Sequence, residues 1–359
     1  MINKKSIIEI TDLIEEYKQA IYWKSLKLKK IYDKFYNKIG RYGLYILQDY
    51  KLTGYKMINI FLYDRETFFI NYNKSLFSII DDIFKNRKTI DITTLKTNFV
   101  NNIYYTLYRI IKSIIEIDKI FKKCPKTTEE YYVYRGIDFK DEKLEENMLN
   151  KLRKLKKGDI FSFNNYLSTS LLNDQALNFL DSHFVETKKA KCCLFRIKIP
   201  KNARVLYLDS DLTVFYMLRQ KRNDIDSNIN NYPVYLISEY ELLLPRSCQL
   251  KYINSYTIKG KVPTVCSIKN LDKKLISDIY VYDFEMIGVD NNREKFDLKN
   301  FVNIKDIQKV FKSFNHMNFK ISKYELYHFS KTTNINDLLK NYEKNSIHRI
   351  DYMIKELNR

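Results

Sequence analysis

The sequence predicts an α+β protein in which helices come first and a mainly antiparallel sheet follows. Up to about residue 121, apolar side chains recur at helical spacing, whereas after Cys124-Pro125 the chain turns to short runs rich in Tyr, Val, Ile and Phe. The 359 residues, 45% of them hydrophobic, are enough to bury a large core. Helices and strands segregated in this way are typical of the α+β class.

One or two helices are expected at residues 6–38, followed by helices at 53–62, 76–85 and 95–121. Thr53 can cap the helix at 53–62, on which Tyr55 and Asn59 share one face because four residues separate them. Asn is a poor residue for a helix interior, so an Asn among apolar neighbours needs a hydrogen-bond partner. A surface position for Asn59 remains the alternative.

Short strands are expected next, interrupted by helices at residues 142–156 and 174–184. The strand-like runs are residues 131–136, 160–163, 194–199, 205–207, 234–237 and 237–245. Residues 259–359 indicate a smaller C-terminal α/β region of unknown role, with a strand at 279–287 and helices at 304–314 and 334–357. That region carries no recognisable catalytic motif.

Two carboxylates, Glu239 and Glu241, lie one residue apart in the run 237–245. In a strand, side chains at positions i and i+2 leave the same face about 7 Å apart. Two like charges at that distance disfavour joint ionisation, so one acid can act as a base or hydrogen-bond partner. Alone, the pattern also fits a solvated strand face.

Arg135 is expected at a strand end, directly before Gly136, where the backbone can approach a ligand closely. A guanidinium there can bind a phosphate through two hydrogen bonds, although an ordinary surface arginine fits as well. The cluster Ser168-Thr169-Ser170 places three hydroxyls after the run 160–163, and such clusters usually form turns.

Charge and cysteine content limit the partners and the compartment. The net charge of +20 suits an anionic partner, either nucleic acid, a membrane surface, an acidic protein or a phosphate-bearing ligand, while the dense run Lys151–Lys157 indicates a solvated helix face. Five cysteines and four histidines without metal-ligand spacing indicate a reduced, intracellular, cytoplasmic protein without a metal. No secretory signal or membrane span is recognisable, so no membrane partner is expected. Abundant Lys, Ile, Asn and Tyr suggest an AT-rich genome, such as that of a large DNA virus or parasite acting in a host cell.

In this order, Arg135, Ser168-Thr169-Ser170 and Glu239-x-Glu241 resemble the Arg-Ser-Glu class of mono-ADP-ribosyltransferases. This class includes clostridial binary toxins, Rho-modifying exoenzymes and vertebrate arginine-specific enzymes. The flanking residues are similar too, with Val-Tyr-Arg-Gly at the first motif and Glu-Tyr-Glu-Leu-Leu-Leu-Pro at the last, and the helix with Tyr50, Tyr55 and Asn59 looks like the family's nucleotide-side helix. The resemblance covers about residues 48–252.

The resemblance implies an ADP-ribosyltransferase-like two-sheet core with an N-terminal helical cap and NAD, used as a substrate, in its cleft. It assigns residues 1–258 to that domain, with a helical part at 1–125 and a sheet part at 126–258. The NAD-contacting set that it implies is Tyr50, Tyr55, Asn59, Arg135, Gly136, Asn165 and Phe179.

The resemblance also implies catalytic roles. Arg135 would hold the NAD phosphates, Ser168 would orient Glu241, Glu241 would bind the ribose 2′-hydroxyl, and Glu239 would position and deprotonate the acceptor. The chemistry agrees, because loss of nicotinamide passes through an oxocarbenium-like state that a fixed carboxylate stabilises.

The sequence departs from the family pattern at several points. Tyr63 stands where the family often has an arginine, and Arg65 is out of register. Residues 221–231 add a polar stretch before the Glu-x-Glu motif that matches nothing in the pattern.

The leading functional hypothesis is a mono-ADP-ribosyltransferase that modifies arginine of a protein, because both Glu239 and Glu241 are present. An NAD glycohydrolase, which uses water as the acceptor, needs Glu241 but not Glu239. The third reading is a non-catalytic scaffold or nucleic-acid-binding protein, which rests on net charge alone.

Overall fold

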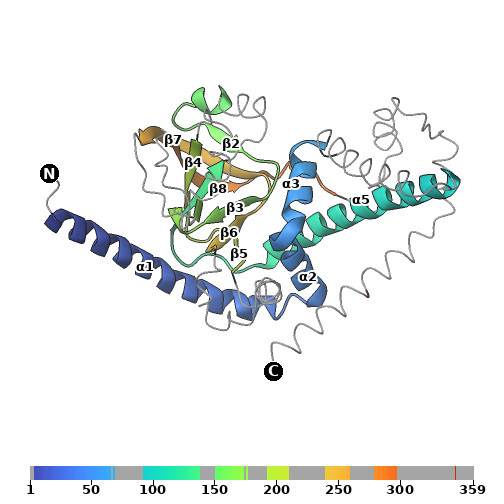
Figure 1. The fold of residues 1–359 in the computed structure, drawn as a ribbon, viewed down its shortest axis with the longest axis horizontal. Coiled ribbons are helices and arrows are strands. Elements are labelled where there is room, and N and C mark those ends of the chain that lie inside the picture. Colours follow the sequence, from blue (N-terminus) through green and yellow to red (C-terminus); the bar gives the residue numbers. More distant parts are fainter. Residues whose placement is uncertain are drawn as a thin grey trace. The chain divides into compact units, whose positions relative to one another are not determined.

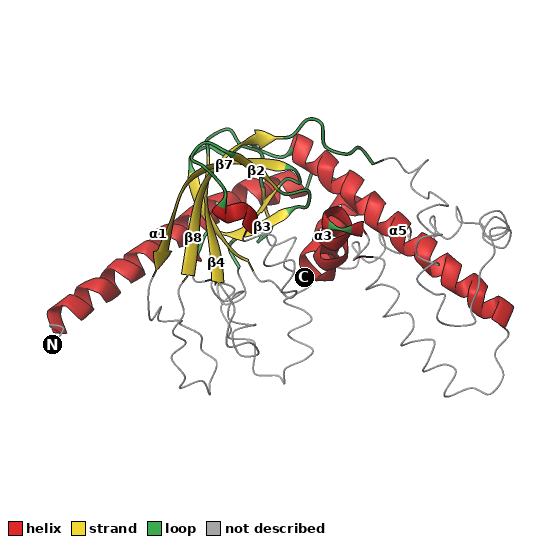
Figure 2. Ribbon diagram, turned by 90° about the horizontal axis from the view of Figure 1, so that it is seen from above, coloured by secondary structure: helices red, strands yellow, loops and turns green. Residues whose placement is uncertain are grey.

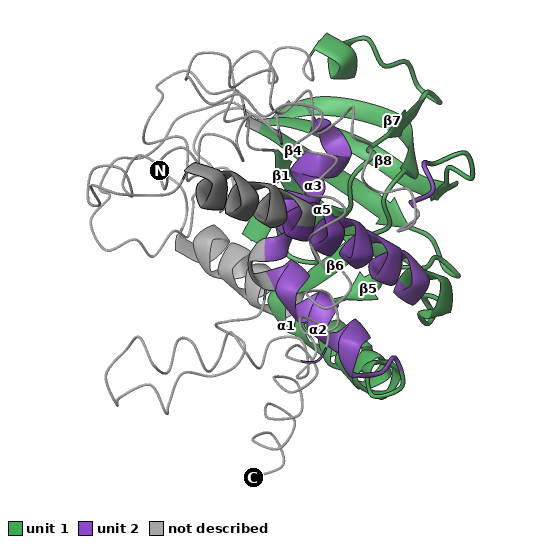
Figure 3. Cartoon of the chain, turned by 90° about the vertical axis from the view of Figure 1, so that its right-hand side faces the viewer, with its two compact units in different colours: residues 1–38, 121–293 green, residues 39–120, 294–359 purple. Residues whose placement is uncertain are grey.

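A computed structural model describes residues 4–65, 68, 92–137, 150–173, 175–176, 192–209, 239–258, 279–296 and 344 (Figure 1). The chain divides into two compact units (Figure 3). Unit 1 comprises residues 1–38 and 121–293, and unit 2 comprises residues 39–120 and 294–359.

Unit 1 contains the helix α1 (Lys4–Tyr36), a single helix where one or two were expected, and eight described strands. The strands are β1 (Tyr131–Ile137), β2 (Ile160–Ser162), β3 (Leu167–Ser170), β4 (Cys192–Ile199), β5 (Leu206–Tyr207), β6 (Glu241–Leu244), β7 (Cys248–Ile258) and β8 (Ile279–Val289). Two of them, β3 and β7, were not expected. The Ser-Thr-Ser cluster therefore lies in a strand and not in a turn, the structure that such clusters usually form.

All eight strands belong to one mixed sheet with the order β2-β7-β8-β4-β1-β3-β6-β5. Every neighbouring pair is antiparallel except β4 and β8, so the predicted α+β class with a mainly antiparallel sheet is confirmed. The strands β1 and β4 pair from Tyr131 to Ile137, whereas β1 and β3 share the single pair Tyr134 and Ser170. This weak seam joins the five-stranded half β2-β7-β8-β4-β1 to the three-stranded half β3-β6-β5. These two halves of one sheet take the place of the two expected sheets.

The five-stranded half curls around an aromatic core. Phe161 of β2 lies 6.4 Å from Phe195 of β4 between ring centroids, although β7 and β8 separate the two strands. Three strand spacings of about 4.8 Å would keep these rings much farther apart in a flat sheet. Phe284 of β8 completes the cluster and lies 5.1 Å from Phe195. Phe195 and Phe284 are fully buried, and burial of each ring contributes about 1.5–3 kcal/mol to the free energy of unfolding.

The end of α1 is fixed to β5 by two buried tyrosines. The hydroxyl of Tyr32 donates to the carbonyl of Val205, and that of Tyr36 donates to the carbonyl of Tyr207 at 2.8 Å. Figure 2 shows α1 together with the strands of this unit. The helix therefore supports the strand that borders β6.

The strand β8, which the sequence analysis assigned to a separate C-terminal region, lies inside this sheet. It pairs in parallel with β4 and in antiparallel with β7, and residues 279–293 belong to unit 1. The expected boundary at residue 258 thus does not coincide with the end of unit 1. A sequence pattern identifies a strand but not its partners, which is why β8 was placed apart.

Unit 2 contains α2 (Arg41–Asp49), the π-helical turn η1 (Tyr50–Gly54), α3 (Tyr55–Tyr63) and most of α5 (Ile92–Lys123). The predicted helices at 53–62 and 95–121 are confirmed, but Thr53 does not cap α3 because residues 50–54 continue from α2 as a π turn. Gly54 permits this turn, since a Cβ there would lie 2.9 Å from the carbonyl oxygen of Asp49. Asp49 in turn forms an ion pair of 2.5 Å with Arg109 of α5.

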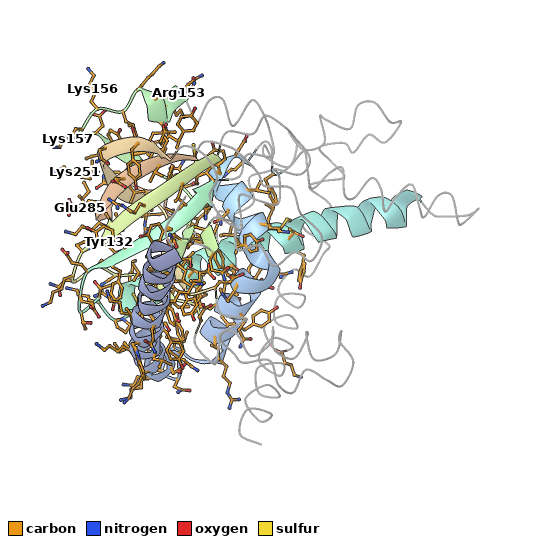
Figure 4. All side chains as sticks on the ribbon, turned by 60° about the vertical axis from the view of Figure 1, so that its left-hand side comes forward. Tyr132, Arg153, Lys156, Lys157, Lys251 and Glu285 are labelled. Carbon is orange, nitrogen blue, oxygen red and sulfur yellow. The ribbon has the colours of Figure 1, made fainter. Side chains whose placement is uncertain are left out.

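The outer face of the sheet carries a row of exposed and half-buried side chains. Register places Ile160, Lys251, Glu285, Lys198 and Tyr132 side by side on β2, β7, β8, β4 and β1. The row continues into the basic run 151–157, and Figure 4 shows Lys156, Lys157, Lys251, Glu285 and Tyr132 along one side of the molecule.

The basic run is exposed at each of its lysines and arginines, as a solvated surface requires. The described helix there ends at Arg153, and the chain then turns back to β7, where the Gly158 N–H donates to the carbonyl of Tyr252. Only the first part of the run is therefore helical.

Several expected elements lie outside the described residues. They are the helices at 76–85, 304–314 and 334–357, most of those at 142–156 and 174–184, the strand at 234–237 and the polar stretch 221–231. Among the helices that the structure describes, none is long and apolar enough to cross a membrane.

Candidate active site

Arg135 lies within β1, two residues before its end, and points toward the seam of the sheet. Its Nη1 donates a hydrogen bond of 2.7 Å to the carbonyl oxygen of Ser168 on β3. The expected position at a strand end is thus only approximate, because β1 continues through Gly136 to Ile137. The guanidinium also lies near Cys248, whose pKa rises to about 12 through burial although the charge of Arg135 lowers it in part.

Ser168 connects this arginine to the candidate catalytic carboxylate. Its hydroxyl donates a hydrogen bond of 2.6 Å to Oε1 of Glu241, the first residue of β6. Glu241 is only 6% exposed, so a donor at this distance orients its carboxylate firmly. Arg135, Ser168 and Glu241 are therefore brought together across the seam, with Ser168 in contact with both of the others.

The other two hydroxyls of the cluster hold the backbone near Glu241. Thr169 donates to the carbonyl of Leu242 at 2.5 Å, and Ser170 donates to the carbonyl of Glu239 at 2.7 Å. Each hydroxyl of Ser168-Thr169-Ser170 thus has a different partner in the segment 239–242.

The expected strand geometry for Glu239 and Glu241 was wrong. The strand β6 begins only at Glu241. Tyr240 before it has a φ of 49°, in the left-handed region of backbone conformations that residues other than glycine rarely adopt. This residue breaks the two-residue alternation, so the two carboxylates do not share a face through strand geometry. Backbone strain of this kind costs about 1–3 kcal/mol and persists only where the surroundings hold it. Here the N–H of Leu171 donates to the carbonyl of Tyr240 at 3.0 Å.

Sequence reasoning missed Asp209, which lies two residues after β5. It is 6% exposed, and its Oδ2 accepts a hydrogen bond of 3.1 Å from the backbone N–H of Glu241. Its signal in the sequence is a single acid that directly follows the apolar run 205–208. Buried carboxylates are rare unless they are paired, so such an acid is a candidate for a specific contact.

Unit 2 brings together the predicted residues Tyr50, Tyr55 and Asn59. The amide Nδ2 of Asn59 donates to the Tyr50 hydroxyl at 3.1 Å, and the rings of Tyr50 and Tyr55 meet edge to face at 6.5 Å. Tyr50 is 1% exposed, whereas Tyr55 is 36% exposed. Asn59 thus has the partner that its place in the helix required, and its buried Oδ1 has no hydrogen-bond partner among the described residues.

Arg65 is committed to contacts within unit 2. It forms an ion pair with Glu294, and its guanidinium lies over the ring of Phe61 at 5.0 Å from the centroid. Tyr63, where the family often carries arginine, is exposed.

Asn165 lies two residues before β3, and its buried Oδ1 accepts no hydrogen bond from a described residue. The predicted residue Phe179 lies outside the described part of the chain. No group of His, Cys, Asp and Glu that could hold a metal ion occurs among the described residues.

Comparison with known proteins gives the family. The model of the ADP-ribosyltransferase exoenzyme family matches residues 28–282, and no curated protein matches the chain. Among solved structures, the Vis toxin of Vibrio splendidus has 16% sequence identity and a TM-score of 0.41, with coverage of 80% of this chain and 93% of that chain.

Plx2a of Paenibacillus larvae has 18% identity and a TM-score of 0.41, over 76% of this chain and 97% of that chain. The C2-I component of the Clostridium botulinum C2 toxin has 16% identity and a TM-score of 0.38, over 76% of this chain and 47% of that chain. The family match spans well over half of the chain. The chain therefore belongs to the ADP-ribosyltransferase exoenzyme family.

Proposed function

We propose that this ADP-ribosyltransferase transfers ADP-ribose from NAD to an arginine side chain of a protein and releases nicotinamide. The observation that carries the proposal is the hydrogen bond of 2.6 Å from Ser168 to Glu241, with a second acid, Glu239, two residues earlier. One carboxylate is fixed by a neighbouring strand, and the other lies on a partly exposed turn. A buried acid suits the reaction at NAD, the donor of ADP-ribose, and a partly exposed acid suits an acceptor arginine that arrives from solvent.

Glu241 acts on the NAD side of this reaction. The bond between the nicotinamide nitrogen and C1′ of the ribose breaks, and its electron pair leaves with nicotinamide. The ribose then carries an oxocarbenium-like charge, which a carboxylate oriented by Ser168 stabilises. Because the carboxylate is held before the reaction starts, it need not reorganise when the charge develops.

Glu239 acts on the acceptor side. A guanidinium is a weak nucleophile because it is normally protonated, and a carboxylate can bind its planar fork through two hydrogen bonds. As a guanidino nitrogen bonds to C1′, Glu239 takes the proton that this nitrogen loses. The hydroxyl of Ser170 donates to the carbonyl of Glu239 and so fixes the backbone of this residue near Glu241.

The remaining predicted residues fit NAD through the groups they offer. Arg135, which directly precedes Gly136, supplies a guanidinium for the phosphates of NAD. Asn165 offers a buried carboxamide oxygen without a hydrogen-bond partner among the described residues, as a ligand-facing group would have. We assign Tyr50, Tyr55 and Asn59, which unit 2 holds together, to contacts with the nucleotide.

The test measures nicotinamide release from NAD by the pure full chain, with and without agmatine, together with the agmatine product. Agmatine carries one guanidinium and is bound in one structure of Vis. Loss of a preorganised electrostatic group costs about 3 kcal/mol, so Glu241→Gln should lower turnover roughly 100-fold. Glu239→Gln should abolish the agmatine product but keep slow hydrolysis. The matched control is Glu285→Gln on the outer face of the sheet, which should behave as the wild type.

Three outcomes separate the alternatives. Release of nicotinamide that agmatine does not raise, with no agmatine product, would identify an NAD glycohydrolase. An agmatine product that persists in Glu239→Gln would remove the assigned role of Glu239. A folded wild-type chain that releases no nicotinamide with NAD, agmatine and cell lysate would overturn the proposed function.

A further inference from the structure

The backbone of Glu241 is held on the side opposite to Ser168. Its N–H donates to Oδ2 of Asp209 at 3.1 Å, and its carbonyl accepts from the N–H of Leu208 at 3.0 Å. The segment 208–209 therefore contacts both polar groups of this residue's backbone.

The register explains why a side chain is used at this point. The strands β5 and β6 pair Leu206 with Leu243 and Tyr207 with Leu242, so the next position would place Leu208 opposite Glu241. A regular antiparallel pair there exchanges two backbone hydrogen bonds. The N–H of Leu208 provides one of these two bonds. In place of the second, the N–H of Glu241 donates to the carboxylate of Asp209 and not to a backbone carbonyl.

The contact lies beside a strained residue. Tyr240, with its φ of 49°, directly precedes Glu241. Such a strained backbone persists only where the surrounding contacts hold it. From β3, Ser170 holds the carbonyl of Glu239 and Leu171 holds that of Tyr240. From β5, the corresponding contact is that of Asp209, whose charge also helps, after burial, to raise the pKa of Tyr240.

We propose that Asp209 is a positioning residue of the transfer reaction, which fixes the turn 239–241 through the amide of Glu241. The inference rests on the proposed function. A hydrogen bond to an ionised acceptor is about twice as strong as one between neutral groups, and burial strengthens it further. Displacement of a catalytic group by about 1 Å can cost on the order of 100-fold in rate.

The test compares Asp209→Ala with Asp209→Asn. Asparagine keeps an oxygen of the same reach that can accept the Glu241 N–H, whereas alanine removes the acceptor. We expect Asp209→Ala to lower kcat for nicotinamide release about 10- to 100-fold while KM for NAD changes less than about threefold. Asp209→Asn should restore kcat to within about fivefold of the wild type, since a neutral acceptor keeps the geometry with a weaker bond.

The matched control is Asp159→Ala. Asp159 also accepts a backbone N–H through Oδ2, from Lys156 at 2.7 Å, but it lies in the exposed basic turn. Its replacement should leave kcat unchanged. Thermal unfolding of all variants then distinguishes a lost contact at the site from a general loss of stability.

Hydrogen exchange of the Glu241 amide tests the contact without relying on catalysis. We expect protection in the wild type and in Asp209→Asn, and faster exchange in Asp209→Ala. If the wild type turns over no NAD, the proposed function fails, and this exchange pattern still decides whether Asp209 holds the turn. The inference is overturned if Asp209→Ala keeps its kcat, if Asp209→Asn is as impaired as Asp209→Ala, or if exchange at Glu241 is the same in all three proteins.

Discussion

Ser168 contacts Arg135 and Glu241 at the same time, with its carbonyl 2.7 Å from Nη1 of the arginine and its hydroxyl 2.6 Å from Oε1 of the glutamate. The strands β1 and β3 share a single residue pair, so this serine supplies much of the polar contact across the seam. A cation and an anion are thereby both held in place by one serine. We expect their positions to match the phosphate and ribose groups of NAD.

Replacement of Ser168 by alanine should reduce catalysis more than binding. The change removes the hydrogen bond of 2.6 Å to the buried Glu241 carboxylate, whose orientation then becomes more variable. We expect kcat for nicotinamide release to fall on the order of 10- to 100-fold, with little change in KM for NAD. Ser162→Ala on the exposed strand β2 is the control. Wild-type kcat in Ser168→Ala would show that the hydrogen bond does not serve catalysis.

Replacement of Arg135 by lysine should instead weaken NAD binding. Lysine keeps the charge but loses the planar fork, and with it simultaneous contact to the Ser168 carbonyl and a phosphate. We expect KM for NAD to rise about tenfold, because a lost hydrogen bond to a charged group costs about 1.5–3 kcal/mol. Arg153→Lys, in the exposed basic run, should keep the KM of the wild type. An unchanged KM in Arg135→Lys would place the phosphates elsewhere.

Tyr50→Phe tests the contact inside unit 2. The Tyr50 side chain is buried and its hydroxyl accepts from Nδ2 of Asn59 at 3.1 Å, so phenylalanine leaves a half-buried amide donor without this partner. We expect the free energy of unfolding, measured with urea, to fall by about 1–2 kcal/mol. Tyr63→Phe, on the exposed part of the same unit, should change it by less than about 0.5 kcal/mol. Equal effects of the two substitutions would contradict the importance of this hydrogen bond.

The sequence predicted those elements whose local pattern agrees with their final environment. The strands β1 and β4 have apolar side chains and β-branched residues that suit a sheet, and both were found. The strand β7 was missed although Cys248, Leu250 and Tyr252 alternate with Gln249 and Lys251, as they do in a half-buried strand. Beyond Tyr252, a register shift between Tyr252 and Asn254 breaks the two-residue period.

The site was predicted by residue type but not by geometry. The motif order was enough to single out Arg135, Ser168 and Glu241, which the structure brings together. The left-handed backbone of Tyr240 and the contact of Asp209 depend on hydrogen bonds between segments far apart in the chain. No local pattern encodes such contacts, so the strand expected at Glu239 and the omission of Asp209 have the same cause.

Cys248 makes the free energy of unfolding depend on pH. The thiol is fully buried, and burial raises its pKa from 9.0 to about 12, while the nearby charge of Arg135 lowers it only in part. Between these values the unfolded chain loses the proton and the folded chain keeps it. This contribution to stability is therefore complete below pH 9 and is lost as the pH rises toward 12, by up to about 1.4 kcal/mol per pH unit.

Cys248→Ala isolates this effect because all other titrating groups are common to both proteins. Removal of the buried sulfur should make the variant less stable at pH 8, and the difference in the free energy of unfolding should shrink by about 2 kcal/mol between pH 8 and 10.5. Urea unfolding at several pH values measures it. Val281→Ala, another buried truncation in unit 1, removes no titrating group and should give a constant difference. A constant difference for Cys248→Ala as well would mean that the thiol ionises equally in the folded and unfolded chain.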